Sequence, residues 1–332
     1  MPDALGPALA AWLSEQAGRA VEVDGLTVAS TGARRVNALF EARTDGTAQR
    51  LALTMIPTAA IQLLDIRDEA DVRLLAESAG VPVPHVHHVC ADDAVLGGPF
   101  FISTAVDGET VPRRVLRLAG EHGVGERIVD QLGDAMARLH AIDPAAAPAT
   151  IPRPEGSGPI ETGLIGIDTH LELLTEPSPV FSYAARWLER HMPAEPDDLA
   201  VVHSDIRNGN IIVGDDGLRA ILDWEGTRIG DPMEDLAWPC QRMWRFREDS
   251  RTVGGFAGVD VLRSAYERAG GRWDQQRFEW WRVHGTVKWG LGLASQARAH
   301  LDGSFRSIVT AASGRRVVEL EYDTLLLLRP NG

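Results

Sequence analysis

The feature that most constrains this chain is the segment HSDIRNGN at 203–210, followed by an aspartate at position 223. It supplies a carboxylate at Asp205, a side-chain amide at Asn210 and a second carboxylate at Asp223. Phosphoryl transfer uses such groups, because a carboxylate orients the attacking hydroxyl and accepts its proton, while oxygen ligands hold Mg²⁺ against the phosphates. The pattern therefore predicts one catalytic base and two metal ligands, provided that the fold brings the three side chains together.

The segments around this motif indicate how the chain could bring them together. Residues 199–202 form a short apolar run that suits a buried strand leading into the loop. The segments 210–213 and 218–222 are β-rich and flank Gly-Asp-Asp-Gly, a sequence typical of a hairpin turn. A hairpin would return Asp223 to the side of Asn210. The alternative is an ordinary loop with turn-forming Asp and Asn residues, which the order of the three residues disfavours.

A helix is predicted just downstream, in the segment GDPMEDLA at 230–237. Asp231 suits the N-cap, Pro232 suits the first helical position, and Glu234 stands where the acidic residue of a capping box belongs. Capping explains Asp231 without any part in catalysis, so a structural and a catalytic role both stay open for it.

These three motifs carry a family resemblance. HSDIRNGN, LDWE at 222–225 and GDPMEDLA resemble the aminoglycoside phosphotransferase family, also called the choline/aminoglycoside kinase-like superfamily, with Ser204 in place of the usual glycine. The C-terminal part is similar to a bacterial branch of that family. The resemblance covers most of the chain from about Gly80 onward. It implies Asp205 as catalytic base, with Asn210 and Asp223 as Mg²⁺ ligands.

The resemblance also implies an architecture, namely an α+β, bilobal protein-kinase-like fold. A small antiparallel-sheet lobe at 1–106 would bind the nucleotide, and a larger, mainly helical lobe at 107–332 would carry catalysis and acceptor binding. Within the first lobe, Glu69 would be the acidic residue of the helix behind the nucleotide. Thr104 and Val106 lie where a hinge would hold adenine through backbone groups.

The phosphate-binding part of the pattern departs from the family. The phosphate loop would contain a single glycine, Gly32, and Thr54 stands where a strand lysine should grip the phosphates. A neutral threonine cannot neutralise phosphate charge, so we expect Arg34 or Arg35, which follow the loop, to substitute, with Arg50 as a further candidate. The competing hypothesis is a pseudokinase-like nucleotide- or ligand-binding protein with weak or absent catalysis.

Hydrophobic patterning predicts different structures for the first 104 residues and for the rest of the chain. The elements expected before residue 104 are strands at 21–23, 26–28, 36–42, 51–55 and 100–104, and a helix around Glu69. The elements expected beyond residue 115 are an amphipathic helix at 128–140, a connector at 143–162, and helices at 171–174 and 183–191. Such a division suits two lobes with separate cores.

Composition limits the partners and the compartment. The 332 residues are 44% apolar, enough for two packed lobes, and the net charge of −14 argues against a nucleic-acid or anionic-membrane partner. Two cysteines give no disulfide framework, and no signal peptide or membrane-spanning run is visible, which together favour the cytoplasm. Composition carries no indication of the oligomeric state.

The expected reaction is phosphorylation of a hydroxyl on a small molecule with Mg²⁺ and ATP, or with GTP as the donor. Seven of the nine tryptophans lie at or after position 224, and most are expected in the core. Trp244 and Glu225 are candidate acceptor-binding residues. An aromatic site would suit a hydroxyacyl group, another apolar antibiotic-like alcohol or a quaternary ammonium, whereas an aminosugar needs several carboxylates. The carboxylates available for that purpose are Glu225, Glu234, Asp235 and Glu279.

Overall fold

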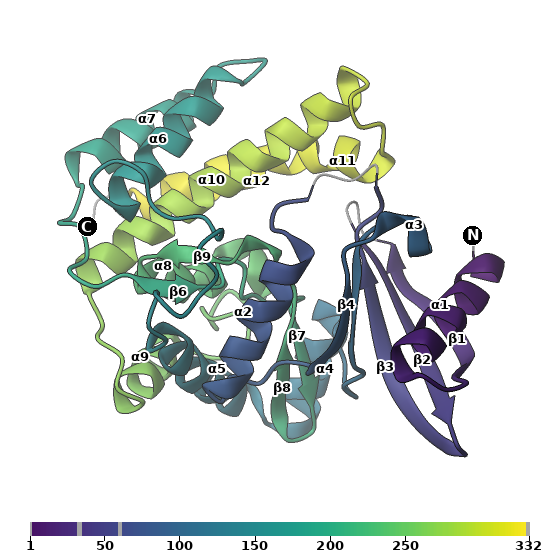
Figure 1. Ribbon diagram of the computed structural model, residues 1–332. Coiled ribbons are helices and arrows are strands. Elements are labelled where there is room, and N and C mark those ends of the chain that lie inside the picture. Colours follow the sequence, from purple (N-terminus) through teal and green to yellow (C-terminus); the bar gives the residue numbers. More distant parts are fainter. Residues whose placement is uncertain (1, 32–34, 59–61, 330–332) are drawn as a thin grey trace.

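The N-terminal third of the chain is built on one antiparallel sheet. The computed structural model describes residues 2–31, 35–58 and 62–329, and it orders the five strands of this sheet β1-β2-β3-β5-β4 (Figure 1). The strands are β1 (Glu22–Thr31), β2 (Val36–Thr44), β3 (Thr47–Met55), β4 (Val86–Cys90) and β5 (Phe100–Thr104). The strands predicted at 36–42, 51–55 and 100–104 are confirmed. The two short strands predicted near residue 25 form one strand whose pairing shifts between Asp24 and Thr27.

Helices cover the two faces of this sheet (Figure 1). Helix α1 (Pro2–Ala17) buries Leu9 and Leu13 in a cluster with Phe100 and Ile102 of β5. Helix α2 (Ile66–Ser78), the helix expected around Glu69, packs against Phe101 of the same strand. Because successive side chains of a strand point to opposite faces, α1 and α2 lie on opposite sides of the sheet. A four-residue helix, α3 (Asp93–Leu96), precedes β5.

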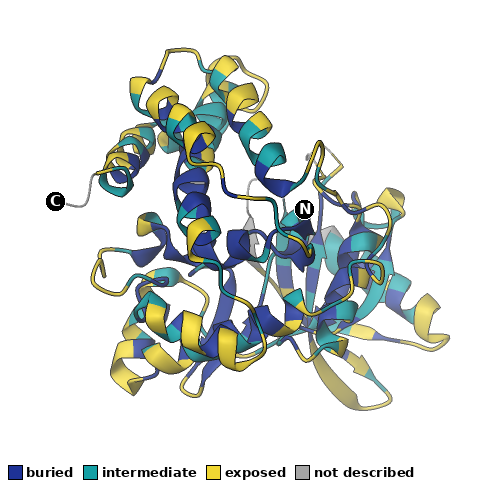
Figure 2. Ribbon diagram, turned by 90° about the vertical axis from the view of Figure 1, so that its left-hand side faces the viewer, coloured by how far each residue is buried: buried dark blue, intermediate teal, exposed yellow. Residues whose placement is uncertain are grey.

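The C-terminal part is mainly helical and surrounds a larger core (Figures 1 and 2). Its α-helices are α4 (Pro112–His122), α5 (Gly125–His140), α6 (Pro159–Glu172), α7 (Pro179–Arg190), α8 (Pro232–Ala237), α9 (Val259–Arg268), α10 (Gln275–Leu301), α11 (Ile308–Ser313) and α12 (Val317–Leu327). Its 3-10 turns are η1 (Trp224–Gly226), η2 (Trp238–Cys240), η3 (Arg242–Arg245) and η4 (Gly314–Arg316). The helices predicted at 128–140 and 183–191 are confirmed within a few residues.

One predicted boundary is wrong. The helix expected at 171–174 is the end of α6, which already begins at Pro159 inside the expected connector. A proline at the first helical position explains the early start, because its fixed φ suits a helix and its missing N–H is not needed there. The connector therefore ends at Gly158.

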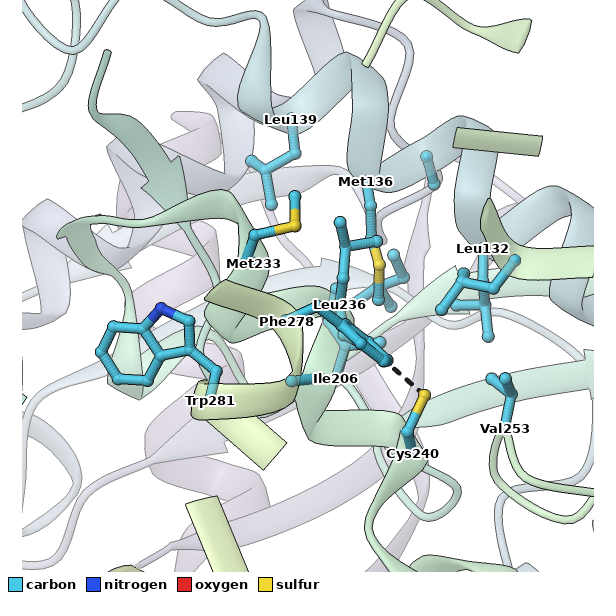
Figure 3. Packing of buried hydrophobic residues seen from close by; sticks show 14 of the residues in the cluster. Leu132, Met136, Leu139, Ile206, Met233, Leu236, Cys240, Val253, Phe278 and Trp281 are labelled. Carbon is cyan, nitrogen blue, oxygen red and sulfur yellow. Dashed lines mark hydrogen bonds between the residues drawn. The ribbon is translucent and has the colours of Figure 1, made fainter. Parts of the chain in front are cut away.

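Short strands hold the 203–210 segment in place. Strand β6 (Ala200–Val202) pairs with β9 (Arg228–Gly230), and β7 (Ile211–Gly214) forms the predicted hairpin with β8 (Gly217–Ile221). Ile206, inside the segment, is fully buried in the core with Leu236 and Phe278 (Figure 3). The chain is thus α+β, with a small sheet-based N-lobe and a helical C-lobe. In the described part of the chain no helix is long and apolar enough to cross a membrane.

Candidate active site

Asp205 is fixed by three donors from its own surroundings. Asn210 Nδ2 donates to Oδ2 at 2.6 Å, while Trp238 Nε1 and Arg207 Nε donate to Oδ1 at 2.7 and 3.0 Å. The side chain of Asp205 is still 28% exposed. Its carboxylate is therefore held in one orientation and remains accessible to a second molecule, as a catalytic base requires.

The loop that carries Asp205 is anchored from behind by a buried carboxylate. The backbone N–H groups of His203 and Ser204 donate to Asp235 at 2.7 and 2.5 Å, and His140 Nε2 lies 3.2 Å from the same side chain. Burial opposes ionisation of Asp235, but the hydrogen bonds and charge of His140 and His203 outweigh it and lower the pKa of Asp235 below its ordinary value. An ionised Asp235 thus positions the start of the loop that carries Asp205.

Ser204, where the related family has glycine, has a positive φ of 67°. Residues with a Cβ rarely adopt this left-handed conformation, which costs them roughly 1–2 kcal/mol. The Ser204 hydroxyl donates to the carbonyl of Gly226 at 2.7 Å, so it links the 203–210 loop to the segment after Asp223. The serine therefore adopts a backbone conformation that is less favourable for it than for glycine, but it makes a hydrogen bond that glycine cannot make.

The hairpin brings Asp223 back to Asn210, as predicted. The N–H of Leu222 donates to the carbonyl of Asn210 at 2.8 Å, and Asp223 follows directly with a φ of 64°. Asp223 Oδ1 is buried and has no hydrogen-bond partner among the described residues, although 34% of the side chain is exposed. Asn210 uses its amide nitrogen on Asp205, and no described residue bonds its amide oxygen. Both oxygens suit a Mg²⁺ ligand, because this cation prefers carboxylate and carbonyl oxygen.

Arg35 joins the two lobes beside Asp223. Its Nη1 and Nη2 donate to Glu69 at 2.9 and 2.6 Å, and its Nε donates to Glu225 at 2.8 Å. Nη1 also lies 4.0 Å from Asp223 Oδ1, and the Arg35 side chain is 10% exposed. Burial would lower the pKa of Arg35, but the charges of Glu69, Glu225 and Asp223 outweigh it and raise the pKa.

Thr54 takes no part in this charge network. Its hydroxyl donates to Asn37 Oδ1 at 3.0 Å across the β2–β3 pair. The cation that meets Glu69 therefore comes from the start of β2, one strand away from the position where the lysine was expected. Of the other predicted phosphate-binding residues, Gly32 and Arg34 lie outside the described residues.

The expected hinge follows the last strand of the sheet. The Thr104 N–H bonds the carbonyl of His85 and the Ala105 N–H bonds that of Arg50, at 2.9 and 3.1 Å, while the Thr104 hydroxyl meets His87 Nε2. The backbone N–H of Val106 has no partner within the described residues. It is thus a donor that a ligand could use.

The two candidate acceptor residues do not lie together. Glu225 is bound by Arg35, whereas Trp244 lies under the guanidinium of Arg207, 4.6 Å from the ring centroid. Sequence reasoning missed Arg207 and Trp238, which both contact Asp205. A signal existed for each, because Arg207 lies inside the motif and Trp238 directly follows GDPMEDLA.

Asp231 is the N-cap of α8, as predicted, whereas the capping-box role of Glu234 is wrong. Asp231 accepts from the Met233 N–H at 3.0 Å and from Trp281 Nε1 at 2.8 Å, and burial raises its pKa. The Glu234 carboxylate turns instead to two cations, Arg228 and Lys288. A charged partner binds a carboxylate more strongly than a free backbone N–H, which explains the difference.

A cavity of about 370 Å³ is lined by residues of α5, α9 and the segments at 196–200 and 270–277. His140, Tyr266 and Arg277 are among its lining residues, but Asp205 and Asp223 are not. It is therefore separate from Asp205 and Asp223.

Comparisons with known proteins identify the family and the fold. The model of the phosphotransferase enzyme family matches residues 34–281. A candidate aminoglycoside phosphotransferase from Ralstonia eutropha superposes with a TM-score of 0.71 at 23% identity, over 97% of each chain. A macrolide 2'-phosphotransferase type I has a TM-score of 0.62 at 20% identity, over 94% of this chain and 96% of the other. The GDP complex of an aminoglycoside 2'-phosphotransferase-IIIa mutant has a TM-score of 0.67 at 14% identity, over 96% and 98% of the two chains.

Curated relatives are similar over part of the chain. Acyl-CoA dehydrogenase family member 11 of Gallus gallus is 32% identical over 177 residues, which are 49% of this chain and 21% of that protein. Acyl-CoA dehydrogenase family member 10 of Mus musculus is 27% identical over 213 residues, which are 63% and 19% of the two. The chain thus spans about a fifth of the length of these relatives.

Proposed function

The chain belongs to the phosphotransferase enzyme family, and we propose that it transfers the γ-phosphoryl group of ATP to a hydroxyl group of a small molecule, with Mg²⁺. The observation that carries the proposal is the convergence of Asp205, Asn210 and Asp223. Asp205 is held by Asn210 itself, and Asp223 is returned next to Asn210 by the β7–β8 hairpin. GTP remains the alternative donor.

In this proposal Asp205 acts as the base. One carboxylate oxygen orients the acceptor hydroxyl and takes its proton as the oxygen attacks the γ-phosphorus. Asn210 and Asp223 would hold Mg²⁺ through their amide and carboxylate oxygens, and the ion would neutralise charge on the phosphates. Trp238 and Arg207 keep Asp205 in place, and both donate to the same oxygen, Oδ1.

Arg35 would replace the missing strand lysine. An arginine has five N–H donors, and Arg35 uses three of them on Glu69 and Glu225. Two donors on its terminal nitrogens have no hydrogen-bond partner among the described residues and could meet phosphate oxygens beside Asp223. The pseudokinase alternative depended on the missing strand cation and on the single glycine of the phosphate loop, and the buried Arg35–Glu69 pair weakens the first of these grounds.

We assign the nucleotide to residues 1–106 and the acceptor to residues 107–332. The adenine would bind the hinge through the Val106 N–H and the Thr104 backbone, and Gly32 and Arg34 would contribute to the phosphate loop. Glu225 would serve to hold Arg35, in addition to any contact with the acceptor. The cytoplasm remains the proposed compartment.

The metal step of this proposal can be tested by thermal unfolding with Mg·ATP, ATP alone and Mg²⁺ alone. Ligand that binds the folded state raises Tm by mass action. We expect Mg·ATP to stabilise the wild type more than ATP alone, and Asp223→Asn to lose that difference while keeping the shift from ATP. Equal shifts with and without Mg²⁺ in the wild type would contradict the assigned ligands. Release of ADP, dependent on an added alcohol, tests the transfer itself.

A further inference from the structure

A second cavity is lined by residues of η3, α10 and α12. Its volume is about 220 Å³, and Asp205 and Asp223 are not among its lining residues. The charged side chains of the lining belong to three arginines and one aspartate, namely Arg242, Arg245, Arg282 and Asp323. The cavity is therefore distinct from the proposed active site, and its lining is rich in positive charge.

Arg245 is a buried cation without an anionic partner. Its exposed fraction is 8%, and it forms no ion pair with a described residue. Its Nη2 and Nη1 donate to the carbonyls of Cys240 and Asp249 at 2.8 and 3.2 Å, and its Nε is buried with no hydrogen-bond partner in the described part of the chain. Burial lowers the pKa of Arg245, and repulsion from Arg282 and Arg242 adds to this effect. Since an arginine stays charged in proteins, a bound anion would stabilise this position.

The carboxylates around the cavity leave this charge uncompensated. Arg242 binds Asp323 at 2.9 Å and Asp249 at 2.8 Å, and Arg282 binds Glu279 at 2.9 Å. Counted together with Arg245, these groups balance, but Asp249 and Glu279 do not line the cavity, and their side chains are 50% and 45% exposed. Water screens such exposed charges. Inside the cavity, three guanidinium groups therefore face the single buried carboxylate of Asp323.

The rest of the lining suits a small ion. Among the described residues Arg282 uses only its Nη1 in a side-chain hydrogen bond, and its side chain is 23% exposed, so its other nitrogens can serve a ligand. Cys240 adds no negative charge, because burial raises the pKa of its thiol to about 12. The lining also includes Thr286 and Leu327. Pockets for drug-sized molecules span about 300–1,000 Å³, so this smaller cavity suits a compact ligand.

We propose that this cavity binds a small oxyanion, a phosphate or a carboxylate, through the guanidinium groups of Arg245 and Arg282. The planar guanidinium matches two oxygens of either group, and a charged hydrogen bond is stronger than a neutral one. The site goes beyond the proposed kinase function and does not depend on it. It does adjoin that function along the chain, because Cys240 ends the 3-10 turn that begins with Trp238, the donor to Asp205.

Thermal unfolding with inorganic phosphate, acetate and chloride at constant ionic strength tests the site. An ion that binds the folded state raises Tm in a saturable way. We expect such a rise with phosphate or acetate beyond that with chloride, and the ion with the lower Kd identifies the oxyanion that the cavity prefers. If neither ion raises Tm more than chloride does, the proposal is wrong.

A variant of α10 locates the binding of the ion. Arg282→Gln should raise the Kd of the preferred ion by roughly tenfold or more, the effect of losing one charged hydrogen bond. Arg186→Gln is the matched control, because Arg186 also pairs with a glutamate three residues away on its helix but does not line the cavity. An equal Kd in the wild type and in Arg282→Gln would place the ion elsewhere and overturn the assignment.

A second variant predicts a change in the opposite direction, which loss of structure would not produce. Asp323→Asn removes the one carboxylate of the lining, so the preferred ion should bind roughly tenfold more tightly even if the variant unfolds at a lower Tm. Weaker binding in this variant would contradict an anion site. The shift with Mg·ATP should persist in both variants. If no protein responds to Mg·ATP but the small ion still binds, the kinase proposal fails while the oxyanion site stands.

Discussion

The loop at 203–210, which carries the proposed base, and the Arg35 network are built in different ways. The loop gathers Asp205 and Asn210 within one short segment and is fixed by backbone hydrogen bonds to Asp235. The Arg35 network joins three distant segments through charged side-chain hydrogen bonds, from the residue before β2, from α2 and from the 223–225 turn. A base must be placed with exact geometry relative to one hydroxyl, whereas a phosphate-binding cation needs only charge and reach. The cation of a phosphate-binding network can therefore be supplied from a different strand.

The largest effect is expected in the catalytic loop. Asp205→Ala removes the base and should lower kcat by roughly a thousandfold or more, at the upper part of the range for general base catalysis. Binding of Mg·ATP should persist, because Arg35 and Asp223 are untouched. Labelled-phosphate transfer and the thermal shift with Mg·ATP measure the two properties separately. Turnover near that of the wild type would show that Asp205 is not the base. The contrast between the 203–210 loop and the Arg35 network would then no longer be one between catalysis and phosphate binding.

Arg35→Ala should affect the nucleotide more than the chemistry. It removes the cation proposed for the phosphates and leaves Glu69, which is 1% exposed, without its partner. Breaking a buried pair costs about 3–5 kcal/mol, so we expect a lower Tm together with a roughly hundredfold higher KM for ATP. The double variant Arg35→Met with Glu69→Gln controls for folding, since it should recover stability but not nucleotide binding. A recovered KM in that variant would show that Arg35 serves the fold alone.

A double variant tests whether the phosphate-binding cation can be supplied from β3 in place of Arg35. The double variant Thr54→Lys with Arg35→Ala places a lysine where related kinases carry it. Thr54 of β3 pairs with Asn37, which lies near the start of β2 and two residues after Arg35. A longer, charged side chain at position 54 would therefore have Glu69 as a target. We expect it to recover about tenfold of the KM lost in Arg35→Ala, as one charged hydrogen bond would. No recovery would mean that the position of the guanidinium, beyond its charge, is required.

The same contrast explains what the sequence could and could not predict. Asp205, Asn210 and the hairpin to Asp223 lie within about twenty residues of one another, so local strand and turn patterns were enough to place them together. Arg35 was one of three candidate arginines, and only the pairing of β2 with β3 and the position of α2 decide which one meets Glu69. The capping role predicted for Glu234 failed for a related reason, because its partner Lys288 lies 54 residues further along the chain.

Lowering the pH should reduce the stability of the C-lobe, in which His284 is buried, whereas Arg35 stays charged. Burial and the charge of Lys288 lower the pKa of His284 to about 3. An unfolded histidine titrates near pH 6.5, so below that pH the unfolded state binds a proton that the folded state does not. The stability contribution of neutral His284 is therefore complete above about pH 6.5 and declines as the pH falls toward 3. Asp235, whose pKa is lowered, loses its contribution only below the ordinary aspartate value near 3.9.

Urea unfolding between about pH 7 and pH 5 measures this dependence. His284→Gln retains a donor that can reach the carbonyl of Gly163, which His284 Nε2 meets at 3.2 Å. We expect the glutamine variant to be less stable at pH 7 and to lose less stability toward pH 5 than the wild type. Parallel pH profiles for the two proteins would show that another group is responsible.

The smallest expected effect concerns Ser204 within the catalytic loop. Ser204→Ala keeps the unfavourable φ of 67° and loses the hydrogen bond to Gly226, so it should destabilise the fold by about 1 kcal/mol. Ser204→Gly loses the same bond but relieves the backbone by a similar amount, so its stability should stay near that of the wild type. The urea midpoints of the wild type and the two variants measure these differences in stability. If the alanine variant is as stable as the glycine variant, the loop does not strain residue 204. Because Ser204 directly precedes Asp205, a loss of kcat in the glycine variant at unchanged stability would show that the cross-link to Gly226 positions the base.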